Sequence, residues 1–169
     1  MSLDGRWNRG WALVTGASGG LGADMARILA ARGFPLVVSA RSGALLEELA
    51  REVGEAHGTP VHVVPMDLSR PGAGDELADA VERLGVPVEV LVNNAGFGQW
   101  GPWTDQDPDE EAAMLRLNVE ALTVLVRRMA PAMVAQGYGR ILNVGSVAGF
   151  FPGPLMTVYY ATKAYVLSF

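Results

Sequence analysis

Short apolar runs rich in valine, leucine and isoleucine recur along the chain and are separated by stretches with a different periodicity. Most of these runs are too continuously apolar for a sheet that keeps one face in water. Such runs are typical of parallel strands that are covered on both faces. We therefore predict five strands, at residues 11–15, 35–40, 61–66, 88–92 and 140–145.

The stretches between these runs repeat apolar residues at helical spacing. In 43–57, for example, Leu45, Leu46, Leu49 and Val53 form one apolar stripe, and the charged residues lie outside it. We predict helices at residues 20–32, 43–57, 74–84, 108–136 and from 157 onward, with the fourth bent near Pro131.

Strands that alternate with helices predict right-handed βαβ units and an α/β fold, a Rossmann-like doubly wound parallel sheet in three layers. We expect a single domain over 11–169, preceded by an N-terminal extension of residues 1–10. Residues 141–162 carry no charge, but their glycines and prolines argue against a membrane helix, so a buried strand and a loop are predicted. The chain ends at Phe169 inside a helical pattern, which suggests that the C-terminal part of the domain is missing.

The composition narrows the possible functions. Half of the 169 residues are hydrophobic and 18% are charged, which is typical of a globular protein. The formal charge of 13 − 18 = −5 argues against nucleic acid or an anionic membrane as a partner. The absence of cysteine excludes disulfides and thiolate chemistry, and the two histidines lie outside any metal-ligand spacing. The first residues contain no apolar run, so no secretory signal is predicted and we expect a cytoplasmic protein.

The segment TGASGGLG, residues 15–22, follows the first predicted strand and opens the first predicted helix. Gly16, Gly20 and Gly22 would allow a tight turn, a close approach of the backbone to a pyrophosphate and close packing of helix on strand. The helix N-terminus would offer free N–H groups to the phosphates. A glycine-rich turn without a ligand is the alternative interpretation.

Other unusual residues also come directly after strands, and parallel strands place all of these positions along one edge of the sheet. Arg41 follows the second strand, 19 residues beyond Gly22, where dinucleotide folds often have an acid. A guanidinium can bind the 2′-phosphate that a carboxylate would repel, so NADP(H) is favoured over NAD(H), although NAD(H) is possible. A solvated arginine at a helix start, and a helix N-cap for Asp67, are the alternatives.

Five motifs in order resemble the short-chain dehydrogenase/reductase family: TGASGGLG, NNAG at 93–96, Asn118, Ser146 and the pair Tyr159 and Lys163. The resemblance covers nearly the whole chain from Trp11. The glycine turn alone is also similar to the extended, epimerase-like branch, but NNAG favours the non-extended branch. The neighbourhoods NNAGFGQWG and YYATKAYVLSF look closest to oxoacyl-reductase-like members.

The resemblance implies reversible hydride transfer between NADP(H) and a carbonyl or secondary alcohol, with a catalytic group of Asn118, Ser146, Tyr159 and Lys163. Ser146 would hydrogen-bond the substrate oxygen, and Asn118 would hold a water that joins Lys163 to solvent. A loop hydroxyl and a buried structural asparagine are the alternatives for these two. The implied cofactor-binding residues are Gly16, Ser18, Gly19, Gly20, Leu21, Gly22, Arg41, Asp67, Leu68, Asn93, Ala95, Gly96, Tyr159 and Lys163.

Tyr159 and Lys163 are four residues apart, so a helix places them on one face. An ammonium next to a phenol favours the phenolate. Tyr159 could therefore exchange a proton with a carbonyl or alcohol oxygen near neutral pH. Tyr160 also neighbours Lys163 on a helix, and geometry does not choose between the two tyrosines; the spacing of the resembled family chooses Tyr159.

The loops after the fourth and fifth strands are rich in large apolar residues, which suggests a hydrophobic substrate, although core or interface packing explains them equally well. The helical stretches 108–136 and 157 onward match the faces that the resembled family uses to form homodimers or homotetramers. Two other functions stay open: an epimerase-like enzyme with bound cofactor, and a non-catalytic NADP-binding redox sensor. The apolar loop residues are Phe97, Trp100, Trp103, Phe150, Phe151 and Met156.

Overall fold

The computed structural model describes residues 10–169 and confirms the α/β fold with a parallel sheet. Five parallel strands pair in the order β3-β2-β1-β4-β5. The N-terminal extension predicted for residues 1–10 lies outside the described residues, except for Gly10. The strands are β1 Trp11–Thr15, β2 Leu36–Ser39, β3 Val61–Val63, β4 Val88–Asn93 and β5 Arg140–Asn143.

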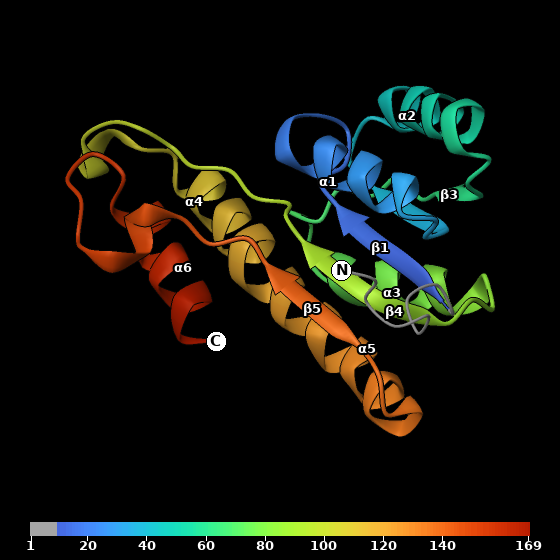
Figure 1. The fold of residues 1–169 in the computed structure, drawn as a ribbon. Helices are drawn as coiled ribbons and strands as arrows, with labels where there is room; N and C mark the ends of the chain where they lie inside the picture. Colours follow the sequence, from blue (N-terminus) through green and yellow to red (C-terminus); the bar gives the residue numbers. More distant parts are fainter. Residues whose placement is uncertain (1–9) are drawn as a thin grey trace.

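Helices cover both faces of this sheet (Figure 1). One face packs against α1 and α2, and the opposite face packs against α3 and α5. The helices are α1 Gly20–Ala31, α2 Gly43–His57, α3 Ala73–Arg83, α4 Pro108–Leu115, α5 Leu122–Gln136 and α6 Thr157–Ser168, with short turns η1 Trp103–Asp105, η2 Arg116–Ala121 and η3 Val147–Phe150.

Successive residues of a strand pack alternately against the two helix layers. Val14 and Val38 belong to the core beneath α1 and α2, whereas Leu13 and Val37 belong to the core beneath α3 and α5. All four side chains are fully buried. Burying such an aliphatic side chain contributes about 1.5–3 kcal/mol, so both residue sets of a strand must be apolar. This arrangement accounts for the continuous apolar runs.

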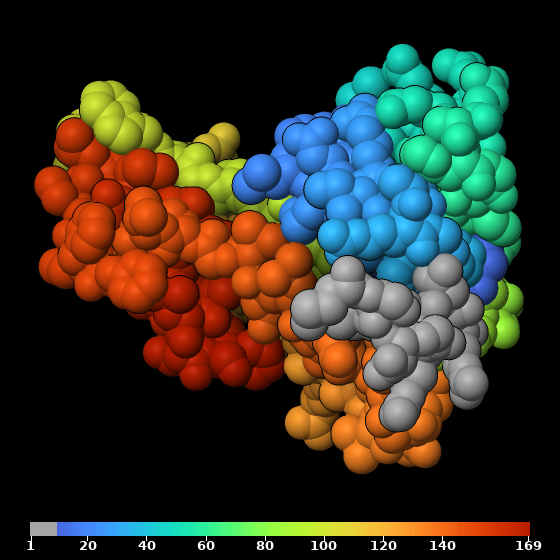
Figure 2. All heavy atoms as spheres, in the orientation of Figure 1, coloured from blue at the N-terminus to red at the C-terminus, as the bar shows by residue number. Residues whose placement is uncertain are grey.

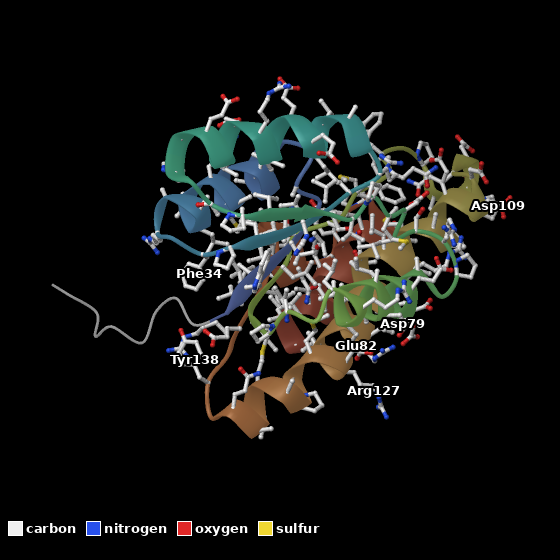
Figure 3. The ribbon with its side chains drawn as sticks, turned by 90° about the vertical axis from the view of Figure 1, so that its right-hand side faces the viewer. Phe34, Asp79, Glu82, Asp109, Arg127 and Tyr138 are labelled. Atoms are coloured by element: carbon white, nitrogen blue, oxygen red, sulfur yellow. The ribbon has the colours of Figure 1, made fainter. Side chains whose placement is uncertain are left out.

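Ion pairs join the outer surfaces of α3 and α5. Arg128 of α5 pairs with Asp75 at 2.9 Å, with Asp79 at 2.6 Å and with Glu82 at 3.2 Å. Figure 3 shows Asp79 and Glu82 on α3 beside α5. Exposed pairs contribute at most about 1 kcal/mol each, so the apolar faces of these helices dominate their packing.

Two predictions about single elements were wrong. The third strand ends at Val63 instead of residue 66, although the N–H groups of Val64 and Met66 still donate to the carbonyls of Val38 and Ala40 at 3.0 Å. The fifth strand is not buried, since Ile141 and Leu142 are 38% and 48% exposed on β5 at the sheet edge. The helical stretch 108–136 is divided by the π-helix η2 and continues through Pro131 within α5, and the bend near Pro131 stays a prediction.

Candidate active site

The carboxyl ends of the strands surround a cavity of about 590 Å³. It lies where the strand order reverses between β1 and β4, the position at which open α/β sheets bind ligands. Figure 2 shows the surface hollowed between the blue atoms of α1 and a lobe formed by the loops that precede α4 and α6. The wall includes the predicted residues Gly16, Ser18, Gly19, Leu21, Arg41, Asp67, Leu68, Ala95, Gly96, Tyr159 and Lys163.

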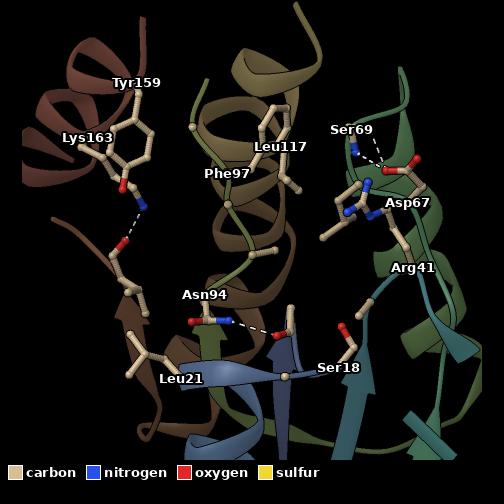
Figure 4. Close-up of a pocket in the computed structure, with 18 of the residues that line it drawn as sticks. Ser18, Leu21, Arg41, Asp67, Ser69, Asn94, Phe97, Leu117, Tyr159 and Lys163 are labelled. Carbon is tan, nitrogen blue, oxygen red and sulfur yellow. Dashed lines mark hydrogen bonds between the residues drawn. The ribbon is translucent and has the colours of Figure 1, made fainter. Parts of the chain in front are cut away.

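The glycine turn is tied to the end of β4 by Asn94 (Figure 4). The Asn94 Nδ2 donates to the carbonyl of Thr15 at 3.0 Å and to that of Gly16 at 3.2 Å. Gly16 has φ +68°, and a Cβ there would lie 2.8 Å from the Asn94 Nδ2. A Cβ on Gly22 would overlap the carbonyl oxygen of Gly16. Both glycines are therefore required by close packing, as the sequence predicted.

The start of α1 is suited to bind a phosphate group. Gly19 occupies the N-cap position, no side chain caps the helix, and its first turn contains no acidic residue. Gly19 and Leu21 line the cavity at this helix end, and the helix dipole favours an anion there. Ser18 and Leu21 lie beside this helix end (Figure 4). These residues fit the pyrophosphate of a dinucleotide.

The change Gly22→Ala is expected to lower the free energy of unfolding by about 1–3 kcal/mol, because the added methyl group overlaps the Gly16 carbonyl and backbone must move. Gly54→Ala is the matched control: its Cβ would meet only the Thr59 carbonyl at 3.8 Å, inside α2. That control should be neutral or stabilising. Urea unfolding of both variants measures the difference, and equal stability would contradict the packing role of Gly22.

The part of the cavity wall that follows β2 and β3 contains Arg41 and Asp67. Arg41 is exposed, and no hydrogen bond or ion pair to another residue of the described chain engages its guanidinium. The Asp67 carboxylate accepts hydrogen bonds from the Ser69 hydroxyl at 2.6 Å and the Ser69 N–H at 3.0 Å. These bonds, helped by the charge of Arg41, lower the pKa of Asp67 below its usual range. The Asp67 carboxylate is therefore held in place as a hydrogen-bond acceptor, next to the unpaired guanidinium of Arg41.

Ser69→Ala is expected to raise the pKa of the Asp67 carboxyl by removing its strongest hydrogen bond. Because the folded pKa lies below the unfolded one, the bond stabilises the fold above the unfolded pKa of about 3.9 and this stabilisation is lost as pH falls through the folded pKa. Carboxyl-carbon NMR titration measures the shift. Thr104→Ala, which removes another hydroxyl bonded to an aspartate, is the control. An unchanged Asp67 titration in the Ser69 variant would contradict the assignment.

Tyr159 and Lys163 both line the cavity from α6. The Lys163 Nζ lies 5.8 Å from the centre of the Tyr159 ring and donates to the Val144 carbonyl at 2.9 Å (Figure 4). Burial lowers the pKa of the Lys163 ammonium, whereas the hydrogen bond to Val144 favours its charged form. A cationic side chain next to a phenol is the arrangement that general acid–base chemistry requires.

Tyr160 lies in a different environment. Its ring packs edge-on against Phe151 with the centres 5.8 Å apart, and it covers Gly153. It lines a second, apolar hollow with Phe150 and Phe151, away from Lys163. Of the two tyrosines, only Tyr159 lines the cavity together with Lys163, which favours it over Tyr160 for the acid–base role.

Asn118 braces the site from the π-turn η2. Its Oδ1 accepts from the Phe97 N–H at 3.1 Å, and its Nδ2 donates to the Phe97 carbonyl at 2.8 Å and to the Thr162 hydroxyl at 3.1 Å. The Thr162 hydroxyl donates in turn to the Tyr159 carbonyl at 2.7 Å. Both amide hydrogens of Asn118 are therefore used to link the β4 loop to α6. Its predicted water stays a prediction.

Several predicted site residues do not lie on the cavity wall. Ser146 caps η3 by accepting from the Ala148 N–H at 3.1 Å, so its contact with a substrate stays a prediction. Asn93 is buried and donates to the Asn143 Oδ1 at 3.0 Å, which ties β4 to β5. Gly20, Gly22 and Asn118 are also absent from the wall.

Sequence reasoning missed other contributors. Thr15 is central: its hydroxyl donates to the Val92 carbonyl and accepts from the N–H groups of Asn94 and Ala95. Of the two asparagines in NNAG, the structure places Asn94 rather than Asn93 on the wall. A buried threonine that ends a strand was the available signal for Thr15. The further wall residues are Ala40, Met66, Ser69, Gly98, Leu117, Val144 and Gly145.

The apolar loop residues divide into two groups. Phe97 and Met156 line the cavity near Tyr159. Trp100 and Trp103 are 73% and 60% exposed and belong to no part of the wall.

Within residues 10–169, no helix is long and apolar enough to cross a membrane, and no group of histidine, aspartate and glutamate side chains could hold a metal ion.

Comparison with known proteins agrees with this geometry. Residues 10–169 match the family described as short chain dehydrogenase. The very-long-chain 3-oxoacyl-CoA reductases of Anas platyrhynchos and Bos taurus are each 35% identical, over 92% and 96% of this chain. The alignments cover 51% and 53% of those proteins, so the chain spans about half the length of these curated relatives.

Solved structures are similar throughout the described fold. The bulky-bulky ketone specific alcohol dehydrogenase from Comamonas testosteroni is 37% identical, with a TM-score of 0.89 over 95% of this chain and 64% of that one. A short-chain dehydrogenase from Sphingobium yanoikuyae in complex with NADPH is 38% identical, with a TM-score of 0.88 over 94% of this chain and 62% of that one. The motifs, the fold and these matches agree, and the chain belongs to the short-chain dehydrogenase family.

Proposed function

We propose that this chain carries the cofactor site and the acid–base group of an NADP(H)-dependent oxidoreductase. It would transfer hydride reversibly between the nicotinamide and a carbonyl or secondary alcohol. One observation carries the proposal: a single cavity has Tyr159 and Lys163 at one end and an unpaired Arg41 at the other. The solved relative in complex with NADPH supports the choice of cofactor.

The residues present fit the cofactor along the whole cavity. Arg41 would bind the 2′-phosphate, because a planar guanidinium matches phosphate oxygens. The uncapped start of α1 would bind the pyrophosphate. Gly96 and Lys163 would contact the nicotinamide ribose. When bound, the nicotinamide supplies or accepts the hydride.

The protein's own part in the reaction is to move a proton. In the reductive direction Tyr159 donates its phenolic proton to the carbonyl oxygen, and in the oxidative direction the phenolate takes a proton from the alcohol. The Lys163 ammonium stabilises that phenolate through its charge. The Ser146 hydroxyl would donate a hydrogen bond to the substrate oxygen as negative charge develops there. The apolar wall at Phe97, Leu117 and Met156 supports a hydrophobic substrate.

The relatives named very-long-chain 3-oxoacyl-CoA reductase and bulky ketone alcohol dehydrogenase agree with an apolar carbonyl substrate. We also propose a cytoplasmic homodimer or homotetramer that associates through α5 and α6. Exposed apolar residues support this assembly: Val134 on α5 is 79% exposed and Leu167 on α6 is 42% exposed.

A turnover screen with NADPH and NADH tests the proposal. Purified intact gene product is offered ketones, oxoacyl thioesters and sugars, and the oxidation of each cofactor is followed by absorbance. We expect consumption of NADPH in preference to NADH, with apolar ketones or oxoacyl thioesters as the better substrates. Substrate conversion without net consumption of NADPH would instead favour an epimerase-like enzyme. Tight NADPH binding without turnover of any substrate would favour a redox sensor.

A further inference from the structure

The loop before α4 and the loop before α6 are joined by three residues, which we call the clasp: Gly101, Gln106 and Leu155. The Gly101 N–H donates to the Leu155 carbonyl at 2.8 Å. The Gln106 Nε2 donates to the Gly101 carbonyl at 2.8 Å and to the Leu155 carbonyl at 3.3 Å. The amide of Gln106 therefore bridges two loops that are 49 residues apart in sequence.

Leu155 adopts an unfavourable backbone conformation in the clasp. Its φ is +66°, and it is the only residue other than glycine with positive φ in the described chain. A leucine is rarely found there, because its Cβ crowds the backbone, and such a conformation persists only where surrounding contacts impose it. Here the Leu155 carbonyl is held by two donors, one from Gly101 and one from Gln106.

The clasp adjoins two segments that lie near the Tyr159 ring, one that contains Met156 and one that contains Gly98. Met156, the residue after Leu155, lines the cavity and immediately precedes α6. On the other loop, Gly98 lies so close to the ring that a Cβ there would be 2.9 Å from the Tyr159 Cδ2 and 2.8 Å from the Met156 Cε. The backbone of Gly98 therefore limits where the ring can lie, and the Met156 Cε lies next to the same glycine.

We propose that Gln106 is a positioning residue for Tyr159. By holding Leu155 in the left-handed conformation, it sets the direction in which the chain enters α6 and presses Met156 and Gly98 against the Tyr159 ring. The inference rests on the proposed function, in which Tyr159 transfers the proton. Gln106 does not line the cavity, so its effect reaches the chemistry only through the clasp.

Gln106→Leu is the informative variant. The Gln106 Oε1 is buried without a hydrogen-bond partner among the described residues, so a leucine of similar size removes only the two donated bonds. With NADPH and a carbonyl substrate at saturation, we expect kcat to fall about tenfold, because a small misplacement of a reacting group costs this much or more. The dissociation constant of NADPH should stay unchanged, since Arg41 and the glycine turn lie at the other end of the cavity.

Two further variants separate positioning from general damage. Gln99→Leu makes the same change in the same loop, where the amide bonds Glu110 instead of Leu155, and it should leave kcat unchanged. Adding Leu155→Gly to Gln106→Leu should restore part of kcat, because glycine adopts positive φ without steric cost. An unchanged kcat in Gln106→Leu would overturn the proposal. So would a parallel loss of kcat, NADPH affinity and melting temperature.

Hydrogen exchange tests the clasp independently of turnover. The Tyr160 N–H forms the first backbone bond of α6, with the Met156 carbonyl at 3.0 Å. In Gln106→Leu it should exchange faster, whereas amides in α2 should be unaffected. If the wild-type protein converts no carbonyl, the proposed function fails, but faster exchange confined to the start of α6 still supports the clasp. Unchanged exchange there would overturn it.

Discussion

Tyr159→Phe is expected to lower kcat for carbonyl reduction by about 10²–10⁴-fold, because the change removes the hydroxyl that donates the proton and nothing else. Phenylalanine keeps the ring and its close approach to Gly98. The affinity for NADPH should therefore change little. Steady-state kinetics measure the loss, and fluorescence titration of NADPH measures the retained binding.

Tyr160→Phe is the matched control, since it removes the same atom from the next residue. Tyr160 packs against Phe151 and Gly153 in the second hollow, so its variant should keep near-normal turnover. If Tyr159→Phe were as active as the wild type, the acid–base role of Tyr159 would be excluded. Loss of turnover only in Tyr160→Phe would assign the role to the other tyrosine.

Arg41→Ala is expected to weaken NADPH binding by about 10–100-fold and to leave NADH binding nearly unchanged. The reason is that a charged hydrogen bond contributes about 1.5–3 kcal/mol, and only NADPH has a 2′-phosphate to accept it. The guanidinium of Arg41 has no competing partner among residues 10–169, so it is available to the ligand. Calorimetric titration with both cofactors measures the two affinities.

Arg70→Ala controls for the loss of one positive charge from this end of the cavity. Arg70 is paired with Glu76 at 2.8 Å, and its charge, like that of Arg41, acts on Asp67. This control should weaken NADPH binding far less than Arg41→Ala. An equal effect of the two variants would indicate a diffuse electrostatic attraction in place of a specific phosphate contact. A parallel loss of NADH affinity in Arg41→Ala would argue against 2′-phosphate recognition.

The glycine turn and the Tyr159–Lys163 pair could be predicted because each depends on residues close in sequence. A turn between strand and helix needs glycines at set positions, and residues four apart on a helix share a face. The roles of Asn93 and Asn94 were not separable in the same way. Which of the two adjacent asparagines reaches the cavity wall depends on where the neighbouring strands end. Those strands come from distant parts of the chain.

The burial of β5 and the position of the turn η2 also depend on contacts between distant segments. The apolar run of β5 predicts a buried strand, but burial depends on which elements cover the faces of a strand, and Ile141 and Leu142 are partly exposed in the described structure. The sequence did not predict the π-helical turn η2, where Asn118 bonds both Phe97 and Thr162. A propensity acts within one turn of helix, whereas this irregularity depends on contacts with two other segments.

The amino-acid sequence alone therefore determined the order of elements, the parallel sheet, the glycine turn and the spacing of the tyrosine and lysine. All of these rest on local conformational preference and on apolar periodicity, which a single chain segment carries. Tertiary structure alone decided which tyrosine lines the cavity, which asparagine reaches its wall, and how Gln106 holds Leu155 beside α6. Those outcomes depend on contacts between residues tens of positions apart, whose relative placement exists only once the helices have packed on the sheet.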